Sequence, residues 1–373
     1  NKNKSLTQIH IKDQLVNEFD ANEVEKILKE YVDRKSLIEN NDLYKFRINF
    51  FKDWLLKYGA EKIIMTISDE QKIKCRKQEE KEAKINSQEI KEFIEKYKIT
   101  YNGKNLTTDD IRAYLEQFES NINQRIIFDI IKNCTYYDIS NIKIIMKRIF
   151  DEIKSYIANN KLSSITYSSG KKITNVLVSN LDNLGKSSTQ YAKYFADENM
   201  ILQKNTTEIN KVLEKIQNDS DIKFLIFTDD FIGSGANIID NIKKIKTDYP
   251  EIFTKELYIF IGVITGFLEG KEKIEKELIK LNLENIKIII HEPLTESDRC
   301  FSDTSKIFTN PQKRKEAENL CWEKGKELVS KDPLGFGDCQ ATIVFPDTCP
   351  NNCLPILWKS TNTFNPLFER KIT

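Results

Sequence analysis

Short apolar runs and amphipathic segments take turns along the second half of the chain. The apolar runs have the length of buried strands and lie at residues 176–178, 224–227, 257–264, 286–290 and 341–345. Segments with apolar residues at helical spacing separate several of them, at residues 189–199, 236–247 and 269–281. This alternation predicts an α/β fold with a mostly parallel sheet and flanking helices, whose ligands bind at the carboxyl ends of the strands.

The region before the first of these strands predicts helices. Thr107 and Asp110 make a good helix start, and Ile111, Tyr114 and Leu115 follow at helical spacing. Further helices fit residues 121–134 and 139–157. We therefore expect a helical region over residues 93–160, ahead of an α/β domain over residues 161–373.

Mixed charges dominate residues 69–92, where Lys, Glu and Asp alternate at helical spacing. Such a pattern is typical of a solvent-exposed helix and predicts a charged connecting helix at a domain boundary. A basic patch over residues 69–92 is the weaker interpretation, because acidic residues interleave with the basic ones. We expect the segment before it, residues 1–68, to form a separate module.

The first module resembles the end of a winged helix. A helical pattern at 22–32 precedes two predicted short strands within 37–46, and a further helix starts at Phe50. The segment from Tyr44 to Trp54 is similar to winged helices fused to bacterial effector and ATPase proteins. The predicted helix is rich in acidic residues, which favours docking to a protein over reading DNA.

Composition narrows the function classes. Lys and Arg number 58 against 57 Asp and Glu, so no overall positive field attracts nucleic acid. Seven scattered cysteines without a CxxC motif fit reduced thiols and a cytoplasmic location. Neither a membrane-spanning apolar run nor a signal peptide is visible, and the first residue is Asn, so we expect no membrane association and a trimmed start.

Three cysteines near the end raise the question of zinc. Cys339, Cys349 and Cys353 lie close in sequence, but His10 and His291 are the only histidines that could complete a set of ligands. Ordinary buried thiols are the favoured interpretation. The shortage of histidine also argues against most histidine-based catalysis.

The most informative motif follows the apolar run at 224–227. Two carboxylates, Asp229 and Asp230, come first, and a small-residue loop then leads into a helical pattern at Ile238. A glycine loop before a helix directs backbone N–H groups at an anion, and the helix dipole adds to the attraction. Carboxylates beside it suit sugar hydroxyls or a phosphate-bound Mg²⁺. We expect both carboxylates to face solvent.

This stretch resembles the phosphoribosyltransferase signature. The resemblance implies that Asp229 and Asp230 orient the ribose of phosphoribosyl pyrophosphate and that the loop holds the 5′-phosphate. The loop residues implied are Gly233, Ser234, Gly235, Ala236 and Asn237. The family usually has threonine where Asn237 stands, although an amide can still donate to phosphate. The alternative is the strand-to-helix turn of any α/β domain.

A second loop supplies the rest of the expected ligand site. It runs from Asn180 to Ser188, between a predicted strand and a predicted helix. In phosphoribosyltransferases such a loop holds pyrophosphate, which implies close approach at Gly185, charge from Lys186 and hydrogen bonds from Ser187 and Ser188. A helix cap at either serine is the alternative. Mg²⁺ is the expected cofactor, bound through the ligand near the two aspartates.

One part of the phosphoribosyltransferase pattern is missing. Many members close a flexible, hairpin-like loop over the reaction. Between Asn199 and Ile222 this chain has only a short polar connection and one predicted helix. Exclusion of water would need another lid.

Several strings toward the carboxyl end extend the resemblance. Those around Arg299, at 333–341 and at 350–358, together with the string at 101–103, resemble phosphoribosyltransferase-like proteins of bacterial anti-phage systems, including retron-associated ones. Arg299 is either a second phosphate contact or part of a structural ion pair. We expect 353–358 to pack on the core beside the nucleobase, where Asn351 and Asn352 either read base edges or cap a turn.

Two functions remain open. The first is an anti-phage effector, a transferase or nucleotide-degrading enzyme that acts on a phosphoribosyl pyrophosphate-like or nucleotide ligand, with Asp229, Asp230 and Lys186 as its catalytic residues. The second is a non-catalytic module that senses a nucleotide or docks nucleic acid or a partner in a retron-type complex. In either case the first module is a candidate for docking a reverse transcriptase–RNA/DNA assembly.

Overall fold

The computed structural model divides into two compact units, Asn1–Glu82 and Ala83–Thr373. It describes residues 6–7, 26, 29–34, 37–40, 43–46, 73–181, 186–254 and 256–370, and for 6–7, 37–38, 40, 43–46, 186–188 and 254 the backbone alone. Among the described residues, no helix has both the length and the apolar character needed to cross a membrane.

A small antiparallel sheet lies in the first unit. Strands β2 (Leu37–Asn40) and β3 (Leu43–Phe46) form a hairpin, as the pattern at 37–46 predicts, and β1 (Leu6–Thr7) pairs with β3. Most of the predicted helix at 22–32 and the segment that starts at Phe50 lie outside the described residues, so the winged helix stays a prediction. The charged segment is helical over residues 73–82 and then turns before α5 (Ser87–Tyr97).

The main sheet of the second unit has four parallel strands, which confirms the α/β fold. They are β7 (Val176–Asn180), β8 (Phe224–Ile232), β9 (Tyr258–Phe267) and β10 (Ile286–Leu294), in the spatial order β10-β9-β8-β7. Parallel strands covered on both faces read as continuous apolar runs, which is why they stand out in the sequence.

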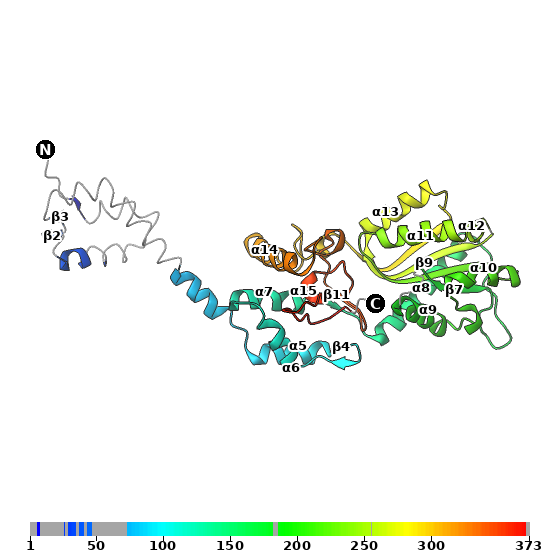
Figure 1. Ribbon diagram of the computed structural model, residues 1–373, viewed down its shortest axis with the longest axis horizontal. Helices are drawn as coiled ribbons and strands as arrows, with labels where there is room; N and C mark the ends of the chain where they lie inside the picture. Colours follow the sequence, from blue (N-terminus) through cyan, green and yellow to red (C-terminus); the bar gives the residue numbers. More distant parts are fainter. Residues whose placement is uncertain are drawn as a thin grey trace. The chain divides into compact units, whose positions relative to one another are not determined.

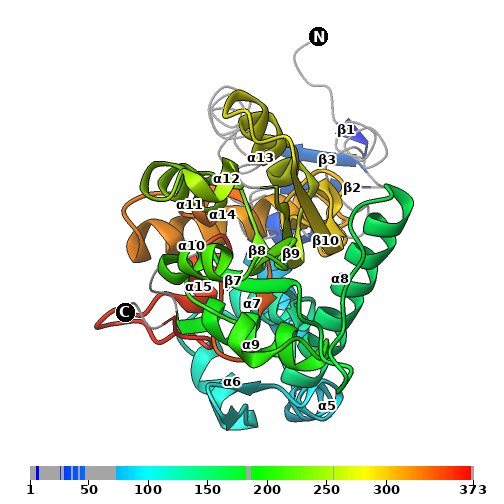
Figure 2. The ribbon, with the colours of Figure 1, turned by 90° about the vertical axis from the view of Figure 1, so that its right-hand side faces the viewer.

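Helices cover both faces of this sheet (Figures 1 and 2). One face packs on α8 (Ile139–Asn159) and α9 (Lys186–Glu198), toward which Phe224 and Ile226 of β8 are buried. The other packs on α10 (Ile209–Asn218), α11 (Ala236–Asp248), α12 (Glu251–Thr254) and α13 (Leu268–Lys280), with Leu225 and Phe227. Each crossover thus moves one strand along the sheet.

The remaining elements form a layer of their own, in which α7, α14, α15 and β11 lie together (Figure 1). The elements are β4 (Thr100–Tyr101), β5 (Lys104–Asn105), α6 (Thr108–Leu115), α7 (Asn121–Lys132), β6 (Thr135–Tyr136), η3 (Glu296–Asp298), α14 (Pro311–Leu328), η4 (Phe336–Asp338), β11 (Ile343–Val344) and α15 (Pro355–Trp358). β11 pairs in parallel with β6. The strand predicted at 341–345 therefore lies outside the main sheet.

The carboxyl-terminal segment completes the core of the helical region. Tyr114 donates its hydroxyl to the Ile356 carbonyl at 3.0 Å, and the Tyr101 hydroxyl donates to the Glu369 carbonyl at 2.8 Å. The Phe364 ring contacts both Tyr114 and Phe118. One buried cluster consequently extends from Ile90 to Phe368, across the boundary predicted at residue 160.

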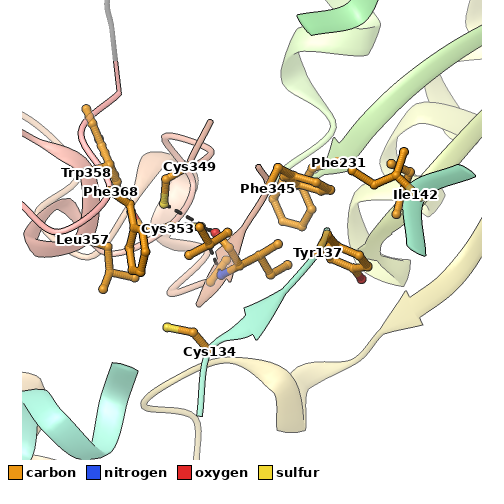
Figure 3. Packing of buried hydrophobic residues seen from close by; sticks show 14 of the residues in the cluster. Cys134, Tyr137, Ile142, Phe231, Phe345, Cys349, Cys353, Leu357, Trp358 and Phe368 are labelled. Carbon is orange, nitrogen blue, oxygen red and sulfur yellow. Dashed lines mark hydrogen bonds between the residues drawn. The ribbon is translucent and has the colours of Figure 1, made fainter. Parts of the chain in front are cut away.

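This cluster also connects the layer to the end of the sheet (Figure 3). Phe345 stacks on Tyr137 with ring centroids 4.9 Å apart, and Phe231 of β8 lies beside them. Cys349 and Cys353 are buried in the same region, and both thiols donate to the Ile343 carbonyl. In the part of the chain that the structure describes, no three potential ligands cluster around a metal position.

Candidate functional site

The acidic pair lies near the carboxyl end of strand β8. The strand runs to Ile232, five residues past the apolar run that predicts it, so Asp229 and Asp230 lie inside the strand near its carboxyl end. Both residues are half-buried, which corrects the expectation that they face solvent. The Asp230 backbone N–H donates to Asp229 Oδ1 at 2.9 Å.

Burial changes the pKa of Asp230. It raises the pKa of Asp230 to about 6, and the negative charge of Asp347 acts in the same direction. A hydrogen bond with Asp229, the positive charge of Arg370 and the Phe231 backbone N–H oppose that increase. Asp347 and Arg370 therefore belong to the surroundings of the pair, although they lie more than a hundred residues away in sequence.

Tyr191 is a third neighbour of the acidic pair, and the sequence pattern predicts only that it lies in a helix. It lies on α9, is buried, and donates its hydroxyl to Asp347 Oδ1 at 3.0 Å. Burial raises the pKa of Tyr191 well above its ordinary value, and the charges of Asp230 and Asp347 raise it further. The hydroxyl thus stays protonated and acts as a hydrogen-bond donor at the carboxylates.

The loop after the acidic pair has the backbone that a helix-terminal anion site needs. Gly235 has φ +82° and immediately precedes α11, so the left-handed conformation favours glycine there. A Cβ at this position would also lie 2.6 Å from the Gly270 carbonyl oxygen. The 13-residue helix α11 therefore begins immediately after this turn, a few residues beyond the acidic pair in the chain.

A neighbouring segment covers this loop. The cavity between them has a volume of about 20 Å³ and is lined by residues 231–238, Phe336 and Asn352. It holds about one water, less than a phosphate group occupies. Asn352 Nδ2 donates to the Phe336 carbonyl at 2.9 Å, and a Cβ on Gly233 would lie 2.3 Å from the Asn352 amide.

The two asparagines beside the covering turn differ in what their side chains do. The backbone carbonyl of Asn351 accepts a hydrogen bond from the Phe336 N–H at 2.9 Å, so the role of the Asn351 side chain stays a prediction. The Asn352 side chain is buried between that turn and Gly233 and holds the turn, which is one of the two roles expected for it. Asn352 also lies against the loop that is expected to bind phosphate.

Arg299 forms ion pairs within the protein, which is one of the two roles expected for it. Its guanidinium pairs with Glu269 at 2.7 Å and Glu296 at 2.8 Å, and donates to the carbonyl oxygens of Asp338 and Cys339. It also lies 4.6 Å from the centre of the Phe267 ring. These contacts hold the end of η4 against β9 and leave Arg299 committed to the covering segment.

The second predicted loop leaves the sheet at the same edge. β7 and β8 are parallel neighbours with Asn180 opposite Thr228, so the chain after Asn180 departs beside the acidic pair. Helix α9 begins at Lys186. Gly185 lies outside the described residues, and the side chains of Lys186, Ser187 and Ser188 do too, so their contacts stay predictions.

The sequence of this region matches a protein-family model. The model named PRTase-CE matches residues 111–370, which is most of the chain. The chain belongs to the PRTase-CE family. The match begins in α6 and ends beside Phe368, so the PRTase-CE region includes the sheet, the acidic pair, the loop and the covering segment. No curated protein matches the sequence.

Membership of the PRTase-CE family supports a phosphoribosyltransferase-like domain. Within it, three features found by sequence pattern come together in space: the acidic pair, the glycine loop and the strand end before α9. Tyr191, Asp347 and Arg370 join them only through folding. An aspartate in a turn and a tyrosine in a helix have no distinguishing local signal.

Proposed function

We propose that the PRTase-CE region binds a phosphoribosyl pyrophosphate-like or nucleotide ligand and transfers its phosphoribosyl group. The observation that supports this most is the half-buried acidic pair on β8, followed directly by the Gly235 turn and the N-terminus of α11. Asp229 and Asp230 bind the ribose hydroxyls, and residues 233–237 bind the 5′-phosphate through their backbone N–H groups.

The reaction is a displacement at the anomeric carbon. The bond from that carbon to pyrophosphate breaks, and pyrophosphate leaves with the electron pair. The acceptor forms the new bond to the same carbon and releases its proton. Positive charge develops on the sugar in between, and carboxylates in a site of low polarity stabilise it. Lys186 at the start of α9 is the proposed contact for the departing pyrophosphate.

Mg²⁺ fits the chemistry of the donor set. Asp229 and Asp230 supply hard carboxylate oxygens, which are the ligands that Mg²⁺ prefers. Asp229 and Asp230 would face a Mg²⁺ carried on the ligand's phosphates. When bound, the ion supplies charge neutralisation to the phosphates.

The first test measures ligand binding and turnover together. Phosphoribosyl pyrophosphate with Mg²⁺ is titrated into the full chain by calorimetry, and pyrophosphate release is followed with candidate acceptors. We expect Asp229→Asn/Asp230→Asn to weaken binding at least tenfold and abolish release. Asp197→Asn, an exposed change on α9, serves as the control. Equal binding by wild type and double variant would reject the ribose assignment.

A second candidate is a nucleotide-binding regulator without transfer chemistry. The cavity of about 20 Å³ at the loop supports it, since the covering segment leaves no room for a phosphate. The connection between α9 and β8 supports it also, because η2 (Gln203–Asn205) and α10 are its helices and it contains no strand. Binding of nucleotide without pyrophosphate release would favour this function over the transferase.

The biological role that we propose is an anti-phage effector, on the resemblance to defence-associated proteins. Its first module docks a partner such as a reverse transcriptase–RNA/DNA assembly. Metabolite profiling of infected cells that express wild type or Asp229→Asn/Asp230→Asn tests this role. Equal phage protection by both proteins would argue against an effector that acts through this site.

A further inference from the structure

Two neighbours of the acidic pair, Tyr191 and Asp347, also line a cavity. Its volume is about 680 Å³, within the range of about 300–1,000 Å³ typical of small-molecule sites. Four separate parts of the fold form its wall: the β4–β5 hairpin, the start of α8, the middle of α9 and the Pro346–Asp347 turn.

Hydrogen bonds hold the segments that form the cavity wall in place. The Asn102 backbone N–H donates to the Pro346 carbonyl at 2.7 Å, which fixes the hairpin against the turn. Asp138 caps α8 by accepting from the Asn141 N–H at 2.7 Å. Tyr191 joins α9 to Asp347 through its hydroxyl at 3.0 Å. The cavity therefore does not depend on one loose loop.

The charges in this wall select the kind of ligand. Two lining residues, Asp138 and Asp347, are acidic, and none of the lining residues that the structure describes is Lys, Arg or His. Lys143 lies nearby over the Tyr194 ring, but it pairs with Glu198 at 3.3 Å. An anion would meet two carboxylates and no cationic lining residue among those described, whereas a group with N–H donors would find acceptors.

The wall also suits a flat ring. Tyr191 and Tyr194 line it with ring centroids 6.5 Å apart, and Ile139 and Ile142 add apolar surface. Polar side chains are interleaved with these rings, among them Asn102, Ser140 and Gln190. Aromatic surface combined with hydrogen-bonding groups is the usual environment of a heterocyclic ligand.

We propose that this cavity binds an uncharged or cationic nitrogen heterocycle with N–H donors and, resting on the proposed function, that this heterocycle is the acceptor of the phosphoribosyl group. Its ring nitrogen forms the bond to the anomeric carbon as pyrophosphate leaves with the electron pair, and its N–H proton passes to the Asp347 carboxylate. Tyr191 holds that carboxylate. The base is therefore bound here and not beside Asn352.

Calorimetry with the full chain tests the cavity. Adenine and cytosine, which are neutral and carry exocyclic amines, are titrated beside the anionic orotate, with and without phosphoribosyl pyrophosphate and Mg²⁺. We expect at least one of the neutral bases to bind at least tenfold more tightly than orotate. Asp347→Asn should weaken that binding at least tenfold, and Asp197→Asn should leave it within twofold.

A second pair of variants tests the location without removing a charge. Ile139→Trp fills the cavity from a residue that is 48% exposed, and Ile144→Trp adds the same ring at a 51% exposed position on the same helix that does not line it. Only Ile139→Trp should lose base binding. Melting temperatures show whether the variants fold. If Asp347→Asn does not fold, the comparison of Ile139→Trp with Ile144→Trp decides whether the base binds in this cavity.

The outcomes separate this inference from the proposed function. Bound phosphoribosyl pyrophosphate without base binding, stronger binding of orotate, or unchanged affinity in Ile139→Trp would overturn the acceptor cavity alone. Base binding that Ile139→Trp removes, in a chain that does not bind phosphoribosyl pyrophosphate, would keep the cavity as a binding site and reject the transferase.

Discussion

At the scale of single residues, Asp230 combines a functional position with a cost to stability. Burial raises its pKa to about 6, above about 3.9 for an unperturbed aspartate. The native state then binds protons more tightly than the unfolded state. The free energy of unfolding consequently falls as pH rises from about 4 to about 6, and stays lower above that.

Asp230→Asn should therefore stabilise the protein at pH 7, by up to about 3 kcal/mol. The two proteins should unfold alike below about pH 4, where both side chains are uncharged. Melting curves from pH 4 to pH 7.5 measure the difference, with Asp197→Asn as a control that shows no such trend. An equal gain at pH 4 and pH 7 would mean that ionisation is not the cause.

Gly235 offers a second test at this scale. Gly235→Ala places a Cβ in the left-handed region and 2.6 Å from the Gly270 carbonyl oxygen. Gly103→Ala meets the same backbone penalty at φ +76°, with no atom within 4 Å. We expect a loss of about 1–2 kcal/mol for Gly103→Ala and a clearly larger loss for Gly235→Ala. Similar melting temperatures for the two variants would show that the loop can shift away from α13.

At the scale of elements, η4 and its partner Asn352 cover the glycine loop. Asn352→Ala removes the amide that lies against Gly233 and the hydrogen bond to Phe336. We expect tighter binding of inorganic phosphate, which probes the expected 5′-phosphate position, and a loss of about 1–3 kcal/mol in stability because the Phe336 carbonyl loses its donor. Unchanged phosphate affinity in the folded variant would mean that the covering turn does not limit access.

Sequence pattern predicts elements well where burial is one-sided and the buried residues are large. The helix expected at 139–157 is observed as α8 at Ile139–Asn159, and Thr107 caps α6 with Asp110 in return. Helix α14 was not predicted, because the buried side it presents includes Ala317, Cys321 and Gly325, whose small size hides the apolar period.

The site shows a similar division. The acidic pair and the glycine loop are contiguous in the chain, so the sequence alone predicts their chemistry. The covering role of Asn352 and the contact of Tyr191 with Asp347 join residues from separate elements. No local pattern records such contacts, and for the same reason the end of β8 was placed too early: two carboxylates resemble a strand end unless the layer that buries them is known.

At the scale of the whole molecule, the carboxyl-terminal segment is a structural part of the helical region. Phe364 is 1% exposed and packs between Tyr114 and Phe118. Phe364→Ala should destabilise the protein by about 3–5 kcal/mol, as expected for a buried aromatic ring. Ile279→Ala, at a 58% exposed position on α13, is the control and should change the melting temperature little. Equal melting of the two variants would contradict the shared core.

The pairing of Tyr101 with Glu369 and of Tyr114 with Ile356 has a consequence for synthesis on the ribosome. The first partner of each pair emerges more than two hundred residues before the second, so the helical region must wait until residues 356–369 have emerged. The sheet can form earlier from neighbouring segments. Chains arrested near residue 330 should therefore resist protease over the sheet and be cut within 87–132, which makes the emergence of residues 356–369 a condition for an assembled site.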